Sequence, residues 1–208
     1  MTPGPAGWLR LVAAAVTAGA ATVVAAAVLF NFLDAARARR VPAWRARSPV
    51  ATGTMTAFFV LLWALLRFRV GAVTPPGALL PALLATLGAL LVAVGAAVNV
   101  AGRSRLGGEW ANQPTVYADH RLVTGGVFGV VRHPLYGSLA WMALGASIEF
   151  ANPLAALAVA GVFVPMMVYR ARQEERALEA RFPEYAAYRR RVGMLFPRLR
   201  RPPQGARS

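Results

Sequence analysis

The 24 residues from Ala78 to Ala101 read ALLPALLATLGALLVAVGAAVNVA and contain no charged side chain. At about 1.5 Å per residue, a helix of this length is longer than the ~30 Å hydrocarbon core of a bilayer. Two earlier blocks, Leu11–Leu33 and Val50–Phe68, are similarly long and apolar. The whole chain is 57% hydrophobic, has only eight acidic residues and has a mean hydropathy of +0.49. We therefore predict three transmembrane helices in the first half of the chain.

Two shorter apolar stretches follow, Leu135–Phe150 and Pro153–Tyr169, with only Ala151 and Asn152 between them. So short a connection predicts a tight antiparallel helical hairpin. The first block is too long for the apolar region of a signal peptide and other spans follow it, so we expect it to be retained. The predicted fold is an all-α, polytopic membrane bundle of about five transmembrane helices with a helical C-terminal region in the cytoplasm.

The charged residues predict the orientation of this bundle. Every one of the 23 basic residues is Arg, and the formal net charge is +15. Twenty of these Arg fall between spans one and two, between spans three and four, or after span five, which all lie on one side. The positive-inside rule then places the C-terminus in the cytoplasm and the N-terminus outside.

The sequence isoelectric point of about 11.8 is typical of nucleic-acid-binding proteins, but no nucleic-acid motif accompanies the charge. Arg beside a membrane span is attracted to anionic headgroups, so we predict membrane lipids and no nucleic acid as partners. The absence of cysteine excludes disulfides, thiolate metal sites and cysteine nucleophiles, and we predict no metal site.

Composition divides the chain into three regions. Residues 1–101 are expected to be a transmembrane scaffold, in which Gly88 and Gly95 would let helices pack closely. Asn31 and Asn99 are polar exceptions that we assign to interhelical or interfacial hydrogen bonds rather than to a ligand. Residues 102–197 are expected to hold a cytoplasmic loop, the helical hairpin and C-terminal helices, and 198–208 a loose basic tail.

The densest group of unusual residues is the string Gly125-Gly126-Val127-Phe128-Gly129-Val130-Val131-Arg132-His133-Pro134-Leu135-Tyr136-Gly137. It lies where the loop enters the fourth span. Glycine lets backbone approach a ligand, and Pro134 suits the first turn of a helix whose free N–H groups can meet an anion. Taken alone, Arg132 and His133 would more often be a headgroup anchor at a membrane boundary.

A second polar group, Arg170-Ala171-Arg172-Gln173-Glu174-Glu175, follows the fifth span. Antiparallel pairing of spans four and five would bring it beside Arg132 and His133. Two carboxylates facing a basic helix start at the rim of an apolar bundle would suit a charged small molecule. Arg170 and Glu174 could instead form a surface ion pair, and Glu175 points about 100° away from Glu174 toward a different partner.

The C-terminal region shows a helical stripe of apolar side chains formed by Leu178, Phe182, Tyr185, Tyr188 and Val192. We expect Pro183 to end one helix and open the next.

Several elements occur in one order along residues 103–197: Leu106-Gly107 with Trp110, Leu122-Val123 with Gly125, Arg132-His133-Pro134-x-Tyr136, and Glu174-Glu175 with the stripe and Pro197. In this order and spacing they resemble the isoprenylcysteine carboxyl methyltransferases and their bacterial relatives. They are also similar to phospholipid methyltransferases, which share the Arg-His-Pro-x-Tyr and Glu-Glu elements. Two departures are Gly126, where the family commonly has an aromatic residue or Pro nearby, and Pro183, where Gly is common.

The resemblance implies a membrane methyltransferase with an S-adenosylmethionine site at the cytoplasmic face and an acceptor that enters from the bilayer. The cofactor residues it implies are Arg132, His133, Tyr136, Glu174 and Glu175, with backbone help from Gly125 to Val131. A carboxylate acceptor needs no general base, and we expect Arg170 to orient it while Glu174 or Glu175 binds the ribose or amino group. An amine or thiol acceptor would need deprotonation by His133 or a glutamate.

The acceptor itself stays open between a prenylcysteine-like carboxylate, a phospholipid amine, a thiol and another lipophilic metabolite. Two other functions also stay open: a sterol-reductase-like enzyme using a nicotinamide cofactor, and a non-catalytic lipid-binding membrane protein. The sequence has no G-x-G-x-x-G dinucleotide-binding motif after a strand that would support the reductase, although a membrane reductase need not have one. Cofactor binding separates the three.

Overall fold

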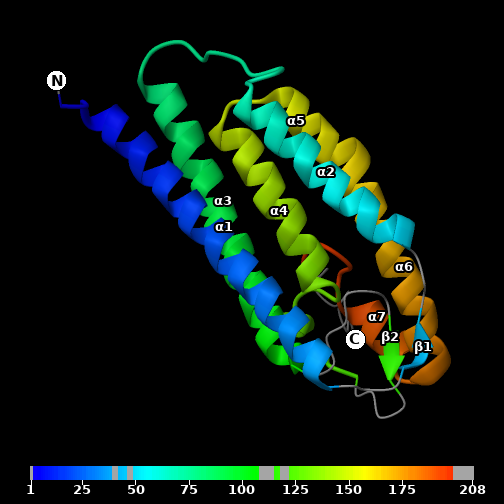
Figure 1. Ribbon diagram of the computed structural model, residues 1–208. Helices are drawn as coiled ribbons and strands as arrows, with labels where there is room; N and C mark the ends of the chain where they lie inside the picture. Colours follow the sequence, from blue (N-terminus) through cyan, green and yellow to red (C-terminus); the bar gives the residue numbers. More distant parts are fainter. Residues whose placement is uncertain (1, 39–41, 46–48, 108–114, 118–121, 199–208) are drawn as a thin grey trace, which may run out of the picture.

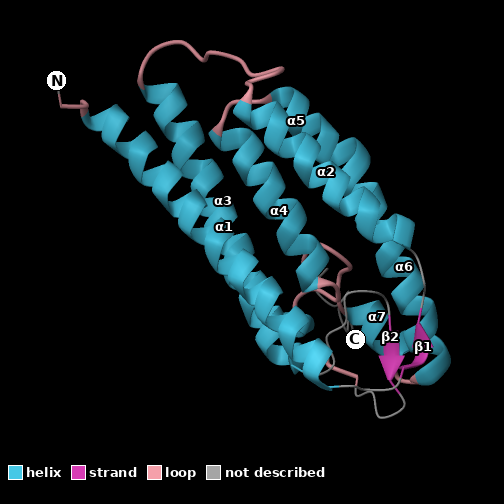
Figure 2. Ribbon diagram, in the orientation of Figure 1, coloured by secondary structure: helices cyan, strands magenta, loops and turns pink. Residues whose placement is uncertain are grey.

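The computed structural model describes residues 2–38, 42–45, 49–107, 115–117 and 122–198. Most of them are helical (Figure 2). Helices α1 (Pro5–Ala38), α2 (Pro49–Arg67), α3 (Leu79–Leu106) and α4 (Pro134–Glu149) cover the first four predicted spans. The fifth is a helix over Pro153–Arg181 that comprises α5 (Pro153–Ala158), the π-helical turn η3 (Val159–Phe163) and α6 (Val164–Arg181).

Three helices are long and apolar enough to cross a membrane: Pro5–Asp34, Leu79–Leu106 and Pro153–Arg181. The segment Gly53–Arg67 of α2 is a shorter apolar helix, and α4 has 16 residues. The chain is thus an integral membrane helical bundle with three candidate spans, and the count of five stays a prediction.

The helices form a bundle with α4 at its centre (Figure 1). Helix α3 packs against both α1 and α4, while α2 packs against α5 on the other side. The short helix α7 (Tyr185–Arg191) lies at the end of the bundle opposite the N-terminus, together with strands β1 (Pro42–Arg45) and β2 (Thr115–Tyr117). These strands pair antiparallel and were not predicted, since each is only three or four residues long.

Close packing between α3 and α4 depends on glycine. A Cβ on Gly88 would lie 2.5 Å from the carbonyl oxygen of Gly145, and one on Gly95 would lie 2.6 Å from Cγ of Met142. The predicted role of Gly88 and Gly95 is confirmed. A polar network crosses the same helices: Asn99 Nδ2 donates to Ser138 Oγ at 2.8 Å, and Arg103 donates to Asn99 Oδ1 at 2.8 Å and to Asn31 Oδ1 at 3.3 Å. Asn31 and Asn99 therefore do make interhelical hydrogen bonds.

The predicted hairpin between α4 and α5 is present. Asn152 caps α5 by accepting from the amide of Ala155 at 2.9 Å. Its Nδ2 donates to the carbonyls of Leu65 and Val70, at 3.2 and 3.1 Å, near the end of α2. One buried side chain thus starts α5 and ties it to α2.

The apolar core lies between α2, α4 and the last long helix. Phe58 of α2 stacks on Phe163 with ring centroids 4.8 Å apart, and Ala140, Val159 and Met167 are buried around them. Phe163 ends the π-helical turn η3, two residues before Pro165. Proline has no N–H and crowds the carbonyl four residues earlier, which explains the wider turn at this place.

Beyond the apolar stretch that ends at Tyr169, helix continues for 12 residues to Arg181, as the amphipathic pattern and Pro183 predicted, because a stretch rich in Arg, Ala, Glu and Leu favours helix. One predicted boundary was wrong. The predicted loop from Gly102 begins five residues late, since α3 runs to Leu106. Pro183 separates α6 from α7 as predicted, and Tyr185, Tyr188 and Val192 form a buried cluster with Leu178 and Phe182. Trp110 and the tail 199–208 lie outside the described residues.

Candidate active site

The segment before α4 is fixed by a second segment from the C-terminal region. The amides of Arg132 and His133 donate to the carbonyls of Gly193 and Met194, at 2.8 and 3.0 Å. One turn later, a Cβ on Gly137 would lie 2.6 Å from the carbonyl of Leu195, so glycine lets the two segments touch. The start of α4, and with it the side chains of Arg132 and His133, is therefore held in place by residues 193–195.

The two carboxylates of α6 meet these side chains and bind different atoms. Glu175 Oε1 accepts from Arg132 Nε at 2.8 Å and lies 3.1 Å from His133 Nε2. Glu174 Oε2 lies 3.4 Å from His133 Nδ1, and its Oε1 accepts from the hydroxyl of Tyr136. The imidazole ring of His133 is thus shared by two adjacent carboxylates.

Exposure separates the roles of the two glutamates. The side chain of Glu175 is 5% exposed, whereas that of Glu174 is 26% exposed. Arg132 and Glu175 form a buried ion pair, and Nη1 of the same Arg also donates to the carbonyls of Arg189 (3.0 Å) and Val192. Glu175 is therefore a fixed internal partner, while Glu174 keeps surface to offer to a ligand.

The charge state of His133 follows from these neighbours. Its burial disfavours the imidazolium, but the hydrogen bonds and negative charges of Glu174 and Glu175 outweigh burial and raise the pKa of His133 above its ordinary value. Both ring nitrogens face carboxylate oxygens, and both can donate only when the ring is protonated.

Tyr136 and Arg170 continue the site toward the bundle. The ring of Tyr136 lies nearly parallel to that of His133, with centroids 5.8 Å apart and an interplanar angle of 9°. The guanidinium carbon of Arg170 is 5.7 Å from the centroid of the Tyr136 ring. Arg170 is only 3% exposed, so it is part of the cluster and not a surface residue.

The backbone from Gly125 to Val131 forms a 3-10 turn, η2 (Gly126–Gly129), beside this cluster. Gly125 lies against the guanidinium of Arg105, and the amide of Val131 is bonded to the carbonyl of Val127 at 3.0 Å. The hydroxyl of Tyr188 donates to the carbonyl of Phe128 at 2.6 Å. Burial raises the pKa of Tyr188 to about 12, so this hydroxyl stays neutral and holds the turn against α7.

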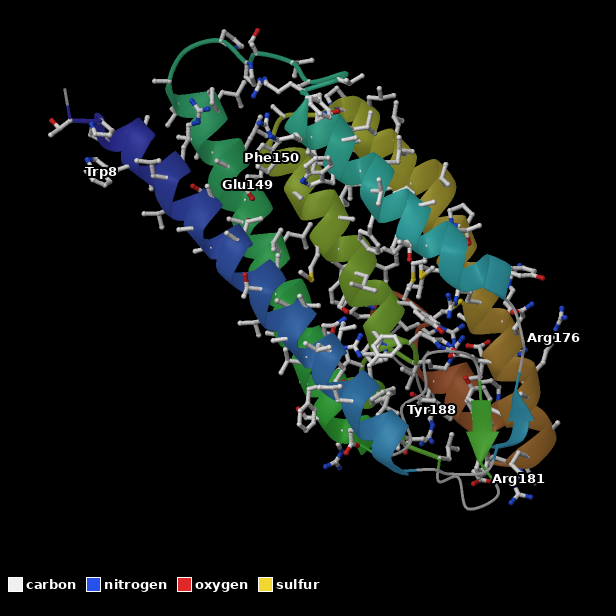
Figure 3. The ribbon with its side chains drawn as sticks, in the orientation of Figure 1. Trp8, Glu149, Phe150, Arg176, Arg181 and Tyr188 are labelled. Carbon is white, nitrogen blue, oxygen red and sulfur yellow. The ribbon has the colours of Figure 1, made fainter. Side chains whose placement is uncertain are left out.

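The structure brings Arg132, His133, Tyr136, Glu174 and Glu175 into one cluster, with Arg170 beside it, as the sequence predicted. Sequence reasoning missed the carbonyls of residues 189 and 192–194 that hold Arg132 and the start of α4. A main-chain carbonyl has no residue-type signal. It also missed Asn152, for which the Asn-Pro pair after an apolar helix was an available N-cap signal. Figure 3 shows Tyr188 at the site end of the bundle, with Glu149 and Phe150 near the other end.

Part of the chain is similar to known proteins. Residues 87–180, which span α3 to the end of α6, match the profile of the isoprenylcysteine carboxyl methyltransferase (ICMT) family. The matched segment includes every residue of the cluster.

Three curated relatives match parts of the chain. The cobalt-zinc-cadmium resistance protein CzcN of Cupriavidus metallidurans is 42% identical over 83 residues, 39% of this chain and 38% of that protein. The protein-S-isoprenylcysteine O-methyltransferase of Saccharomyces cerevisiae is 32% identical over 114 residues, 53% of this chain and 48% of that protein. The protein-S-isoprenylcysteine O-methyltransferase B of Arabidopsis thaliana is 35% identical over 74 residues, 35% and 38% of the two chains. The chain therefore covers less than half the length of these relatives.

A solved structure of the eukaryotic intramembrane Ras methyltransferase ICMT is similar to this chain. It has a TM-score of 0.51 and 22% sequence identity, over 73% of this chain and 53% of that one. The segment that matches the ICMT family model thus lies within a helical fold of the same kind.

Proposed function

We propose that this chain is an integral membrane methyltransferase that uses S-adenosylmethionine and acts on a lipophilic acceptor with a prenylcysteine-like carboxylate. The observation that supports it best is the contact between Arg132, His133 and Tyr136 at the start of α4 and Glu174 and Glu175 of α6. All five lie in the ICMT-family segment, and protein-S-isoprenylcysteine O-methyltransferases are among its relatives.

The donor set fits the proposed cofactor. S-adenosylmethionine carries ribose hydroxyls and an ammonium group that need acceptors, and a carboxylate that needs donors. The partly exposed Glu174 can supply the acceptor, and Tyr136 and His133 lie on either side of it. Glu175 has a second role, because it orients Arg132 and His133 from a buried position. Gly125 and Val131 flank the turn η2, in the backbone segment that leads directly into Arg132 and His133.

When bound, S-adenosylmethionine supplies a methyl group on a positively charged sulfur, which a carboxylate oxygen can take by direct displacement. The protein's tasks are to orient the acceptor and to exclude water. Arg170 is buried beside Tyr136 and can orient an acceptor carboxylate by a charge-assisted hydrogen bond. A carboxylate acceptor is already ionised, so none of these residues has to act as a base.

The proposal extends to the organisation and orientation of the chain. Residues 1–101 serve as scaffold, 102–197 as the catalytic region and 198–208 as a basic tail. The bundle end with α7 and the cluster faces the cytoplasm, since twenty of the 23 Arg belong to that side in the predicted topology.

Calorimetric titration of the purified protein in detergent with S-adenosylhomocysteine and, separately, with NADPH tests the proposal. We expect binding of the first and none of the second. Glu174→Gln should weaken S-adenosylhomocysteine binding by about 1.5–3 kcal/mol, because a charge-assisted hydrogen bond is lost. Arg176→Gln is a matched control, since Arg176 is exposed and points away from the bundle (Figure 3). Binding of NADPH alone would favour a reductase, and binding of neither would remove the proposed cofactor.

A further inference from the structure

A hollow of about 560 Å³ adjoins the cluster at Arg132 and is otherwise lined by the C-terminal region. Three arginines line it, Arg132, Arg189 and Arg198, together with Val192, Gly193, Met194, Phe196 and Pro197. Among the described residues that line it, none is acidic. The proposed methyl transfer uses neither Arg189, Arg198 nor Phe196.

Two of the three guanidinium groups are held in position by main-chain carbonyls. Nη1 of Arg132 donates to the carbonyls of Arg189 and Val192, and Nη1 of Arg198 donates to the carbonyl of Arg190. The third, Arg189, forms an ion pair with Glu179 of α6, in which Nη1 of Arg189 lies 2.7 Å from Oε1 of Glu179. Each guanidinium has five N–H donors, so these contacts leave donors for a ligand. Prepositioned arginines favour a phosphate group, which their planar forks match in geometry and charge.

The rim of the hollow is apolar and reaches the surface of the bundle. Phe196 is 56% exposed, and its ring centroid lies 6.1 Å from that of Trp141. Trp141 is seven residues into α4, which is about 10 Å from its first residue at 1.5 Å per residue. Phe196 is exposed and Trp141 is partly buried, and an aromatic pair near the start of an apolar helix is typical of the membrane interface. A ligand at the arginines would therefore have its tail beside lipid.

We propose that this hollow binds the phosphate group of an anionic phospholipid, with the phosphate at Arg189 and Arg198 and an acyl chain along Phe196 and Trp141. The shared chemistry is a phosphate anion, and the apolar rim favours the lipid over a free phosphate. Because Arg132 lines this hollow and also holds Glu175, the lipid would lie next to the proposed cofactor site and share Arg132 with it.

Native mass spectrometry of the full chain in a neutral detergent tests this inference, with phosphatidylglycerol and phosphatidylcholine of equal chain length. We expect one phosphatidylglycerol to bind about tenfold more tightly than phosphatidylcholine, because both lipids carry a phosphate but only phosphatidylcholine brings a cationic choline group close to the arginines. Arg198→Gln should abolish most of that preference, whereas Arg176→Gln, which removes the same charge from the outer face of α6, should keep it. Size-exclusion chromatography shows that each variant remains folded.

Three results would overturn the inference. Equal losses in Arg198→Gln and Arg176→Gln would mean that total charge, and not the hollow, attracts the lipid. Displacement of phosphatidylglycerol by an equal concentration of inorganic phosphate would make the hollow a site for a soluble anion. Displacement by S-adenosylhomocysteine would make the hollow part of the cofactor site. If the lipid test fails while S-adenosylhomocysteine still binds, the lipid proposal is wrong and the proposed function is unaffected.

Discussion

His133 is held between two carboxylates that follow each other along α6. Successive residues of a helix point about 100° apart, so Glu174 and Glu175 reach the ring from different directions and meet different nitrogens. Only the imidazolium can donate from both nitrogens at once. The cluster is therefore built around a charged histidine, which makes its stability depend on pH.

We expect protonated His133 to stabilise the folded protein. Its pKa in the folded state is raised above the ordinary 6.5, so the stabilisation is fully present below that pH and is lost as pH rises through the folded-state pKa. Melting temperatures in detergent, followed by tryptophan fluorescence, should show a larger difference between wild type and His133→Gln at about pH 6 than at about pH 9. The other histidine, His120, is common to both proteins and cancels in the difference. A difference independent of pH would contradict a charged His133.

For single residues, the sequence predicted which side chains form the site, but not the main-chain carbonyls that hold them in place. Arg132, His133, Glu174 and Glu175 are titratable residues gathered at the ends of two apolar stretches, and a hairpin can bring those ends together. The division of roles between Glu174 and Glu175 needed the structure, because burial depends on how residues 193–195 pack against α4.

Among the elements, the junction of α4 and α5 depends most on a single side chain. Asn152 is 1% exposed, caps α5 and donates to two carbonyls at the end of α2. Replacing it leaves the amide of Ala155 and the carbonyl of Leu65 without these bonds in an apolar setting. The connection between the hairpin and α2 should weaken as a result.

Asn152→Ala should lower the free energy of unfolding by about 1–3 kcal/mol, the range for loss of an N-cap together with buried hydrogen bonds. Unfolding in mixed micelles with increasing sodium dodecyl sulfate measures the change. Asn152→Ser is the matched control, since Ser can still cap α5 but is too short to replace the amide that reaches α2. We expect it to recover about 1 kcal/mol of the loss. An Ala variant as stable as wild type would contradict the role of Asn152.

Hydropathy predicted where the long helices begin more closely than where the last one ends. Apolar composition reports contact with lipid, and it stops at Tyr169. Helix propensity continues through Arg170–Arg181, where Arg, Ala, Glu and Leu predominate, and the helix continues with it. Strands β1 and β2 pair residues 70 to 75 positions apart in the chain, a contact that local composition does not encode.

For the whole molecule, the arrangement of helices places the cluster at one end of an apolar bundle. Arg132 and His133 immediately precede α4, and Glu175 lies six residues before the end of α6, which is about 9 Å along a helix. The sequence predicted this placement from the order of its apolar stretches. It could not predict which helices surround α4, because that depends on close contacts such as Gly88 with Gly145 and Phe58 with Phe163.

This placement predicts how the acceptor of the proposed methyl transfer arrives. A reacting group one or two helical turns inside the membrane boundary can be reached sideways by a molecule that is dissolved in the bilayer. Each buried CH₂ adds about 0.8 kcal/mol to membrane partitioning or binding. Methylation should therefore rise steeply with the length of the acceptor's alkyl or prenyl chain, because a longer chain raises the concentration of acceptor beside the site.

The measurement is transfer of labelled methyl from S-adenosylmethionine to a series of acceptors that share one carboxylate and differ only in chain length. Concentrations stay below saturation, so that rates report both partitioning and binding. Glu174→Gln serves as the control for enzyme-dependent transfer, because it should lower the rate for every chain length while keeping the dependence on length. A soluble acceptor would have to reach the cluster from the aqueous end of the bundle, where added CH₂ groups bring no advantage. Equal rates across the series would therefore rule out lateral entry and favour a small soluble acceptor.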